Sequence, residues 1–352
     1  MATIQQHQIL KSGYLLKDRY EIERVAGAGG FGVGYIATDI ELETKVFIKE
    51  CFPKSMVCRG GDQVTVFLLD AESENDFNWA LNQFVQEGKT LASFREISNI
   101  VTVHDAFRAN STAYMVMSYE GGKDLNKWRE SLEKEGIPLT EEGLLRVFAP
   151  LTKALDTLHQ RDMLHRDIAA DNIIIRDEKD GVTPGPVLID FGSARKAFAD
   201  RAMTAVIKPK YAPLEFYSRD GKDQGPWSDI YALGAVLHKL ITGTLPPEAT
   251  ERVNNDPYKK LSRDASYSQF TPEFLKAIDW ALEPRVEKRP KDLKTWFRQL
   301  SAGQRRIKEA IKKKEDRKRK LRTRIVAGVS ALVAAAAIAY ALLKDPNLED
   351  GR

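Results

Sequence analysis

MLHRDIAADNIIIRDEKDGVTPGPVLIDFG, from Met163 to Gly192, is the stretch that decides the fold of this 352-residue chain. Its two apolar and mostly β-branched runs, Ile173–Ile175 and Val187–Ile189, are typical of short buried strands. Turn-forming residues lie between them, so the stretch predicts a hairpin. The hairpin would bring together two carboxylates and one amide, those of Asp167, Asn172 and Asp190. Such a group suits Mg²⁺ with a polyphosphate, because Mg²⁺ prefers few carboxylates together with phosphate oxygens.

The order of these polar residues resembles the catalytic loop and the metal-binding turn of protein kinases. His165-Arg166-Asp167 is followed by Asn172, and Asp190-Phe191-Gly192 comes directly after the second strand. Either tripeptide alone is a weak signal, and a polar loop on another α/β protein is the alternative. The resemblance implies that Asp167 is catalytic and accepts the proton of the substrate hydroxyl. It also implies that Asn172 and Asp190 hold Mg²⁺.

A glycine-rich stretch near the N-terminus, Gly27–Gly34, lies between two strand-like segments. A dinucleotide-binding turn is the alternative, but that turn should open a helix. Strand followed by strand instead favours a hairpin lid, whose backbone N–H groups can approach phosphates. The kinase resemblance implies ATP contacts from Gly27, Ala28, Gly29, Gly30, Phe31 and Gly32. The chain departs from the family at Gly34, where a Val usually packs on the adenine.

Val46-Phe47-Ile48-Lys49 resembles the kinase strand that ends in a phosphate-binding Lys. The next segment, Asp76–Phe94, has apolar residues at helical spacing. Glu87 falls where the family has the helix Glu that pairs with this Lys. The resemblance therefore implies a Lys49–Glu87 pair, with Lys49 and Glu87 as catalytic residues and Lys49 on the ATP phosphates. The intervening segment, 51–75, is longer than a minimal connection, and the sequence suggests no function for it.

The strand-like segment that ends at Ser118 resembles the strand leading into the kinase hinge. The resemblance places Met117 at the back of the adenine pocket. It also implies that backbone groups of the hinge, at Ser118, Tyr119 and Glu120, hydrogen-bond the adenine. A core strand followed by a turn is the plainer interpretation, and both can hold.

Three further residues extend the resemblance toward the C-terminus. Glu215, in YAPLE, resembles the Glu at the end of the kinase activation segment, and Arg289 resembles its buried partner. Asp229 resembles the residue that holds the catalytic-loop backbone. The resemblance thus implies an α+β, bilobal protein-kinase-like fold. It consists of an N-terminal tail (1–19), a small, mostly β N-lobe (20–118) and a larger, mostly α C-lobe (119–300).

One pair of departures from the family could explain each other. Ala169 stands two residues after Asp167, where serine/threonine kinases usually carry a Lys. Counting back from Glu215, Lys208 stands where the family has the Thr that faces that Lys. We hypothesise that Lys208 supplies the missing positive charge as a catalytic residue near Asp167. The alternative is a solvated loop residue beside Lys210.

Charge is unevenly distributed in the C-terminal region. Residues 305–324 hold 12 Lys/Arg and 3 Asp/Glu, so this basic linker (301–324) accounts for the net charge of +4. Ile325–Leu343 is uncharged over about 19 residues, roughly 28 Å of helix, which predicts one C-terminal transmembrane helix. The positive-inside rule then expects a kinase domain in the cytoplasm, a single-pass anchor in the inner (plasma) membrane and an extracytoplasmic tail, 344–352. A basic amphiphile lying on anionic lipid is the alternative.

The remaining composition excludes several classes of function. The body of the chain is mildly acidic and shows no nucleic-acid surface. Only two cysteines are present, Cys51 and Cys58, so no disulfide framework is expected. The sequence therefore predicts a membrane-anchored kinase that uses ATP and Mg²⁺ to phosphorylate Ser/Thr of protein substrates in signalling. A pseudokinase-type binding module and a small-molecule kinase are the alternatives, and a homodimer is left open.

Overall fold

A computed structural model of the chain describes residues 8–177, 185–191, 208–218 and 223–343. The chain divides into two units, Met1–Leu300 and Ser301–Arg352, and each is a separate body. All the predicted catalytic and nucleotide-binding residues belong to the first unit.

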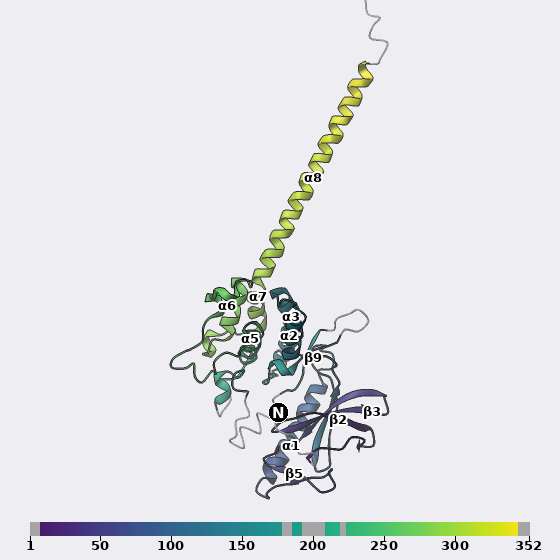
Figure 1. Ribbon diagram of the computed structural model, residues 1–352, viewed down its shortest axis with the longest axis vertical. Helices are drawn as coiled ribbons and strands as arrows, with labels where there is room; N and C mark the ends of the chain where they lie inside the picture. The colour runs from purple at the N-terminus through teal and green to yellow at the C-terminus, as the bar shows by residue number, and fades with distance from the viewer. Residues whose placement is uncertain (1–7, 178–184, 192–207, 219–222, 344–352) are drawn as a thin grey trace, which may run out of the picture. The chain divides into compact units, whose positions relative to one another are not determined.

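The N-lobe is built on a six-stranded antiparallel sheet (Figure 1). Its strands in spatial order are β1 (Leu15–Leu16), β2 (Tyr20–Ala28), β3 (Gly32–Asp39), β4 (Thr44–Cys51), β8 (Thr112–Ser118) and β7 (Val103–Ala109). Helix α1 (Glu74–Ala92) packs against β7 and β8. It buries Phe77, Leu81 and Phe84, at the helical spacing that the sequence predicts. Together the sheet and the helix carry Lys49 and Glu87.

The long connection between β4 and α1 forms a hairpin of its own. Its strands, β5 (Val57–Arg59) and β6 (Val66–Leu68), pair antiparallel in a separate two-stranded sheet. Val57 and Val66 are buried in the same core as the large sheet. The connection is therefore an integral part of the N-lobe.

The C-lobe is mostly helical. Its helices are α2 (Leu125–Lys134), α3 (Glu141–His159), α5 (Pro226–Thr242), α6 (Pro272–Ala281) and α7 (Leu293–Leu300). Five short 3₁₀ turns lie among the described residues: Ala170–Asn172, Leu214–Tyr217, Leu261–Arg263, Ala265–Tyr267 and Val286–Lys288. Every residue from Ser228 to His238 of α5 is buried, as expected of a helix that is apolar on all sides. The predicted α+β bilobal fold is confirmed.

The hairpin predicted around the catalytic residues is present. β10 (Ile173–Ile175) pairs antiparallel with β11 (Pro186–Leu188), and β9 (Lys123–Asp124) adds a third strand on the other side of β10. The second strand ends one residue earlier than predicted, because Asp190 takes a left-handed backbone with φ of 60° and turns the chain. Asn172 before β10 and Asp190 after β11 thereby lie at the same end of the hairpin.

The prediction of a transmembrane helix at Ile325–Leu343 is wrong. These residues form the second half of α8 (Ala302–Leu343), one continuous helix. In the part of the chain that the structure describes, no helix combines the length and the apolar character needed to cross a membrane. Eight of the nineteen residues are alanine, whose methyl group adds little apolar surface. The predicted inner-membrane location is therefore wrong as well; the predicted tail, 344–352, lies outside the described residues.

Candidate active site

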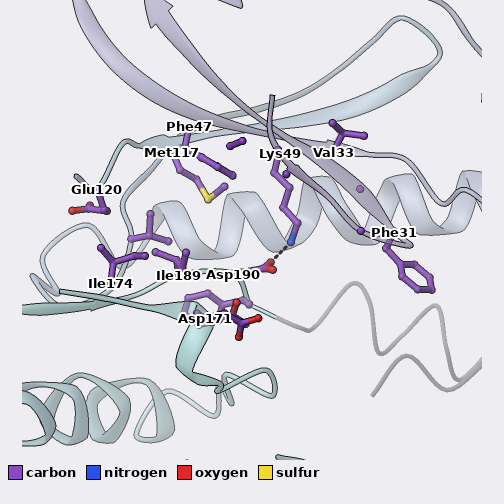
Figure 2. A pocket seen from close by; sticks show the side chains of 18 of the residues that line it. Phe31, Val33, Phe47, Lys49, Met117, Glu120, Asp171, Ile174, Ile189 and Asp190 are labelled. Carbon is purple, nitrogen blue, oxygen red and sulfur yellow. Dashed lines mark hydrogen bonds and ion pairs between the residues drawn. The ribbon is translucent and has the colours of Figure 1, made fainter. Parts of the chain in front are cut away.

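A cavity of about 780 Å³ lies between the N-lobe sheet and the hairpin of the C-lobe (Figure 2). Its walls come from the glycine-rich loop, from β4, from the segment after β8 and from both ends of the β10–β11 hairpin. Predicted site residues that line it are Gly27, Gly29, Gly30, Phe31, Gly32, Lys49, Met117, Ser118, Glu120, Asn172, Asp190 and Lys208. Ala28, Glu87 and Asp167 are not among the lining residues. The sequence thus predicted most of one continuous surface.

One end of the cavity is apolar. Phe47 and Met117 line it from the N-lobe, while Ile174 and Ile189 line it from the hairpin (Figure 2). Met117 is buried, with 5% of its surface exposed. A flat aromatic base fits such a surface, because binding pockets combine apolar walls with few polar groups.

Phe47 explains the departure from the family at Gly34. A Cβ built on Gly34 would lie 2.6 Å from Cζ of the Phe47 ring, closer than real Cβ contacts. Gly34 pairs with Lys49 across the strands, so Phe47 is its diagonal neighbour on the same face. The ring therefore occupies the space that a side chain at position 34 would fill. The sequence reasoning missed this role; the signal was an aromatic residue diagonally opposite a Gly.

The segment predicted as the hinge, Ser118 to Glu120, lines the cavity after β8. The backbone N–H of Ser118 donates to the carbonyl of Thr102 at 2.9 Å, which ends the sheet there. The carboxylate of Glu120 accepts from the Arg176 guanidinium at 2.6 Å, and this ion pair ties the hinge to the residue after β10. The hinge backbone is therefore held at the edge of the cavity by contacts to both lobes.

The opposite end of the cavity is polar. Lys49 forms an ion pair with Asp190, and both side chains are about one quarter exposed (Figure 2). The Asn172 amide donates to the Asp167 carboxylate at 2.8 Å and to the Asp167 carbonyl at 2.7 Å. Lys49 is thus paired with Asp190, and Asn172 is paired with Asp167. The amide oxygen of Asn172 and the carboxylate of Asp190 are hard oxygen donors, and a Mg²⁺ ion that also binds phosphates fits this set.

Glu87 is buried on α1, with 8% of its surface exposed. Lys49 forms an ion pair with Asp190. The predicted Lys49–Glu87 pair remains a prediction.

A buried carboxylate holds the catalytic loop in place. Asp229 at the start of α5 accepts from the backbone N–H groups of His165 and Arg166 at 2.9 and 3.0 Å. It also contacts the His159 ring nitrogen at 2.8 Å. Burial alone would raise the pKa of Asp229, but the hydrogen bond from His159 and the neighbouring donors hold it below its usual value. The predicted role of Asp229 is confirmed, and the loop backbone includes Arg166 in a left-handed conformation, with φ of 67°.

A second buried pair ties the end of the activation segment to the C-lobe. The Arg289 guanidinium donates to both oxygens of Glu215, at 2.9 and 2.6 Å. The hydroxyl of Ser228 donates to the same carboxylate at 2.6 Å. The predicted Glu215–Arg289 pair is confirmed.

Lys208 lies at the polar end of the cavity. Its ammonium donates to the Asp171 carboxylate at 2.7 Å, and both residues line the cavity beside Asn172. The carbonyl of Lys208 accepts from two backbone N–H groups, those of Tyr211 and Ala212, so a turn fixes its backbone. Lys210, two residues on, is exposed.

Cys51 follows Lys49 by two residues and lines the same cavity. Its side chain is buried, and burial raises the pKa of the thiol to about 12. The thiol is therefore protonated at neutral pH.

A comparison with protein families matches residues 20–305 to the protein kinase domain. The chain is similar to CBL-interacting protein kinase 14 of Oryza sativa, with 27% identity over 305 residues, covering 84% of this chain and 63% of that protein. It is also similar to the serine/threonine-protein kinase PknB of Mycobacterium tuberculosis, with 29% identity over 268 residues, covering 72% of this chain and 38% of that protein. The chain thus spans less than two thirds of the length of these curated relatives.

Among solved structures, the chain resembles one described as PpkA-294 in its apo form. The TM-score is 0.74 at 37% identity, and the match covers 83% of this chain and 99% of that one. The family match, the likeness to this solved structure and the residues that line the cavity all indicate the same family. The chain belongs to the protein kinase domain family.

Proposed function

We propose that this chain transfers the γ-phosphoryl group of ATP to Ser/Thr hydroxyls of protein substrates. The observation that carries the proposal is the polar end of the cavity. There Lys49, Asn172 and Asp190 line the cavity together with the glycine-rich loop, Lys49 pairs with Asp190, and the Asn172 amide donates to the Asp167 carboxylate. The family implies use of ATP and a divalent metal, and an apolar slot beside a polar end suits a nucleotide.

The proposed mechanism is mainly positioning and charge neutralisation. Lys49 would hold the α- and β-phosphates as a point charge, and the backbone of the glycine-rich loop would donate N–H groups to them. Asp167 would orient the substrate hydroxyl and accept its proton, with its carboxylate fixed by the Asn172 amide. Asn172 and Asp190 would hold Mg²⁺, which neutralises the charge that develops on the phosphates.

The test is transfer of labelled phosphate from ATP-Mg²⁺ to a generic protein substrate by the full chain, with Asp167→Asn as its control. We expect transfer by the native chain and none by the variant. A native chain that binds ATP without transferring label would contradict the proposal. It would favour a pseudokinase-type binding module, the second candidate function.

One specific observation favours that second candidate function. Ala169 is fully buried and uncharged at the position where the catalytic loop of the family usually carries a Lys. A loop without that ammonium neutralises less of the transferred charge, unless another cation replaces it.

We further propose that Lys208 is the replacing cation. It lines the cavity beside Asn172, and its ion pair with Asp171 directs the ammonium toward the catalytic loop. The turn at Tyr211 and Ala212 fixes the backbone from which the side chain extends. A Lys on a flexible four-carbon stem can therefore enter the phosphate end from the side opposite to Ala169.

Lys208→Ala should lower the transfer rate by roughly 10²–10³, the usual cost of removing one transition-state charge contact. The matched control is Lys210→Ala, which removes an exposed Lys of the same segment and should leave the rate unchanged. Lys208→Thr combined with Ala169→Lys should restore part of the rate. A Lys208→Ala enzyme with nearly native kcat would exclude Lys208 from the reaction.

A further inference from the structure

The hairpin β5–β6 supplies an arginine that contacts the strand carrying Lys49. Arg59 donates to the Glu50 carboxylate at 2.5 Å, and the side chains of both are fully buried. β4 alternates, so Phe47 and Lys49 face the cavity while Ile48 and Glu50 face the opposite side. The ion pair therefore holds β4 from the face directly behind the phosphate-binding Lys.

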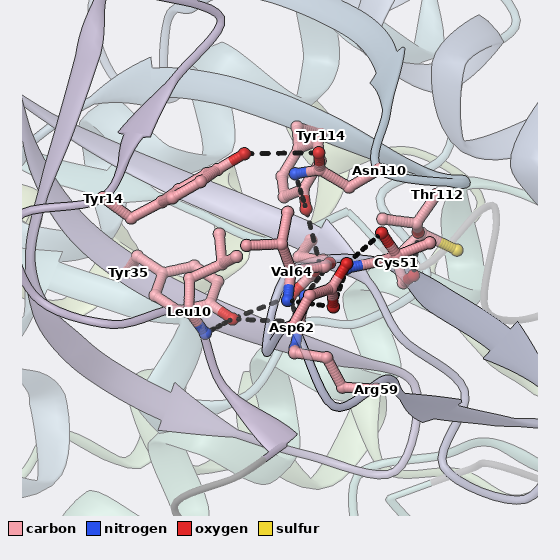
Figure 3. Close-up of polar contacts among 12 residues, drawn as sticks. Leu10, Tyr14, Tyr35, Cys51, Arg59, Asp62, Val64, Asn110, Thr112 and Tyr114 are labelled. Carbon is pink, nitrogen blue, oxygen red and sulfur yellow. Dashed lines mark hydrogen bonds and ion pairs between the residues drawn. The ribbon is translucent and has the colours of Figure 1, made fainter.

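Glu50 is the centre of a buried polar network with Tyr35, Arg59 and Tyr114, which Figure 3 labels. The hydroxyls of Tyr35 and Tyr114 donate to its two oxygens at 2.7 and 2.8 Å. Both tyrosines lie on strands that pair with β4. A carboxylate that accepts from three donors is satisfied without water, which fixes its position in three dimensions. Arg59 is the only one of these donors that comes from outside the six-stranded sheet.

The residues between β4 and the β5–β6 hairpin hold the glycine-rich loop. The backbone N–H of Phe52 donates to the Phe31 carbonyl at 2.9 Å, and that of Lys54 donates to the Gly30 carbonyl at 3.0 Å. The Arg59 guanidinium stands over the Phe52 ring, 5.1 Å from its centre, and Phe52 is fully buried. Arg59 thus packs on Phe52, whose backbone N–H donates to the glycine-rich loop.

Gly32 shows how closely the loop approaches this strand. A Cβ on Gly32 would lie 2.5 Å from the Glu50 carbonyl oxygen, so β3 and β4 approach at a distance that only Gly allows. A shift of Glu50 would therefore move the loop and Lys49 together, because interiors packed at this density transmit displacement.

We propose that Arg59 is a positioning residue for the phosphate end of the cavity. Through Glu50 it fixes Lys49, and through Phe52 it fixes the backbone of the glycine-rich loop. The hairpin between β4 and α1 thereby sets the affinity for nucleotide phosphates and leaves the adenine end unaffected. The inference rests on the proposed function only for the identity of the ligand.

The test compares two probes on the full chain by titration calorimetry: ADP with Mg²⁺, and adenosine, which has no phosphate. Arg59→Met should weaken ADP binding by roughly tenfold to a hundredfold, the equivalent of one or two charged contacts. Adenosine binding should stay unchanged, and Arg59→Lys should recover most of the ADP affinity. Arg108→Met is the matched control, since Arg108 is an exposed Arg of the same lobe that contacts Asn82 on α1.

A purely structural role predicts a different result, in which both probes lose affinity in parallel as the folded fraction falls. That result, or unchanged ADP binding, would overturn the inference. If Arg59→Met does not fold, as judged by circular dichroism, Tyr35→Phe removes a single hydrogen bond to the same carboxylate and carries the same comparison. Absence of phosphoryl transfer by the native chain would contradict only the proposed function. The two titrations do not depend on turnover, so they would still test the role of Arg59.

Discussion

Gly34 and Phe47 form a complementary pair at the adenine end of the cavity. Gly34→Val should weaken nucleotide binding, because its Cβ would overlap the Phe47 ring and displace it at the cavity wall. Phe47→Ala combined with Gly34→Val should recover binding, since the two changes together conserve volume. ATP affinity of the single and double variants, measured by titration, checks this. Equal affinities of Gly34→Val and the native chain would contradict it.

Lys49 is expected to act on phosphates and to contribute little to folding. Lys49→Met should reduce phosphoryl transfer to background while leaving the melting temperature nearly unchanged, because the side chain is partly exposed at the cavity wall. Transfer rate and thermal unfolding are measured on the same preparation. The control is Lys45→Met, which removes an exposed Lys of the same strand that contacts Glu23. Full activity with Met at position 49 would remove Lys49 from the site.

His165 gives a prediction on pH. Burial lowers the pKa of its ring to about 4, and the ring packs on Phe191 with 4.3 Å between centroids. In the unfolded chain the same ring binds a proton near pH 6.5. The stability contributed by the neutral ring is therefore complete above pH 6.5 and is lost as the pH falls toward 4.

His165→Phe keeps an aromatic ring on Phe191 and removes the titrating group. Between pH 7.5 and 5 the native chain should lose about 2 kcal/mol more unfolding free energy than this variant does. Urea unfolding at the two pH values measures the difference. His104 and His238 also have lowered pKa values through burial, but they are common to both proteins and cancel. Identical pH slopes would show that His165 binds a proton as readily in the folded chain as in the unfolded chain.

At the level of elements, the Glu215–Arg289 pair joins the end of the activation segment to the start of α5 and to the segment between α6 and α7. Arg289→Met should cost about 3–5 kcal/mol of unfolding free energy, because it leaves a buried carboxylate without its cation. Glu215→Gln combined with Arg289→Met should recover much of that loss. The control is Arg146→Met, which breaks an exposed pair with Glu142 and should cost about 0.5 kcal/mol or less. Chemical denaturation measures all three, and equal costs for the two single variants would contradict the prediction.

Elements with a strong local pattern were predictable. The helix at 76–94 follows from apolar spacing, and the hairpin at Ile173–Ile175 follows from β-branched runs between turn formers. The polar residues at its ends were predictable too, because a short hairpin fixes where they lie. What could not be predicted depends on long-range pairing, such as Arg59 with Glu50 or Phe47 beneath Gly34. Neither contact has a local pattern.

For the whole molecule, the sequence-based prediction of an anchor failed where composition was ambiguous. A stretch of 19 uncharged residues satisfies the length rule, yet alanine dominates Ile325–Leu343 and the helix continues from the charged half of α8. The kinase body was predicted correctly because many independent landmarks had to agree.

The division of the chain into two units yields a prediction at this scale. All residues that line the cavity lie between Arg24 and Lys208, inside the first unit. A chain truncated after Ser301 should therefore keep the native kcat on a generic protein substrate and the native affinity for ADP-Mg²⁺. Steady-state kinetics and titration check both values. A truncated chain that folds but has lost ADP affinity would show that the second unit contributes to the site.

Cys51 has a consequence for covalent modification of the cavity. Cys51 is among the residues that line the cavity, so it is a natural target for an electrophile carried by a nucleotide-competitive compound, although its side chain is buried. With a pKa of about 12, however, only about one thiol in 10⁵ is ionised at neutral pH, and the thiolate is the reactive form. Acrylamide-type warheads and peroxide should therefore leave the nucleotide site intact. Selective covalent compounds aimed at this cavity would have to target a residue other than Cys51.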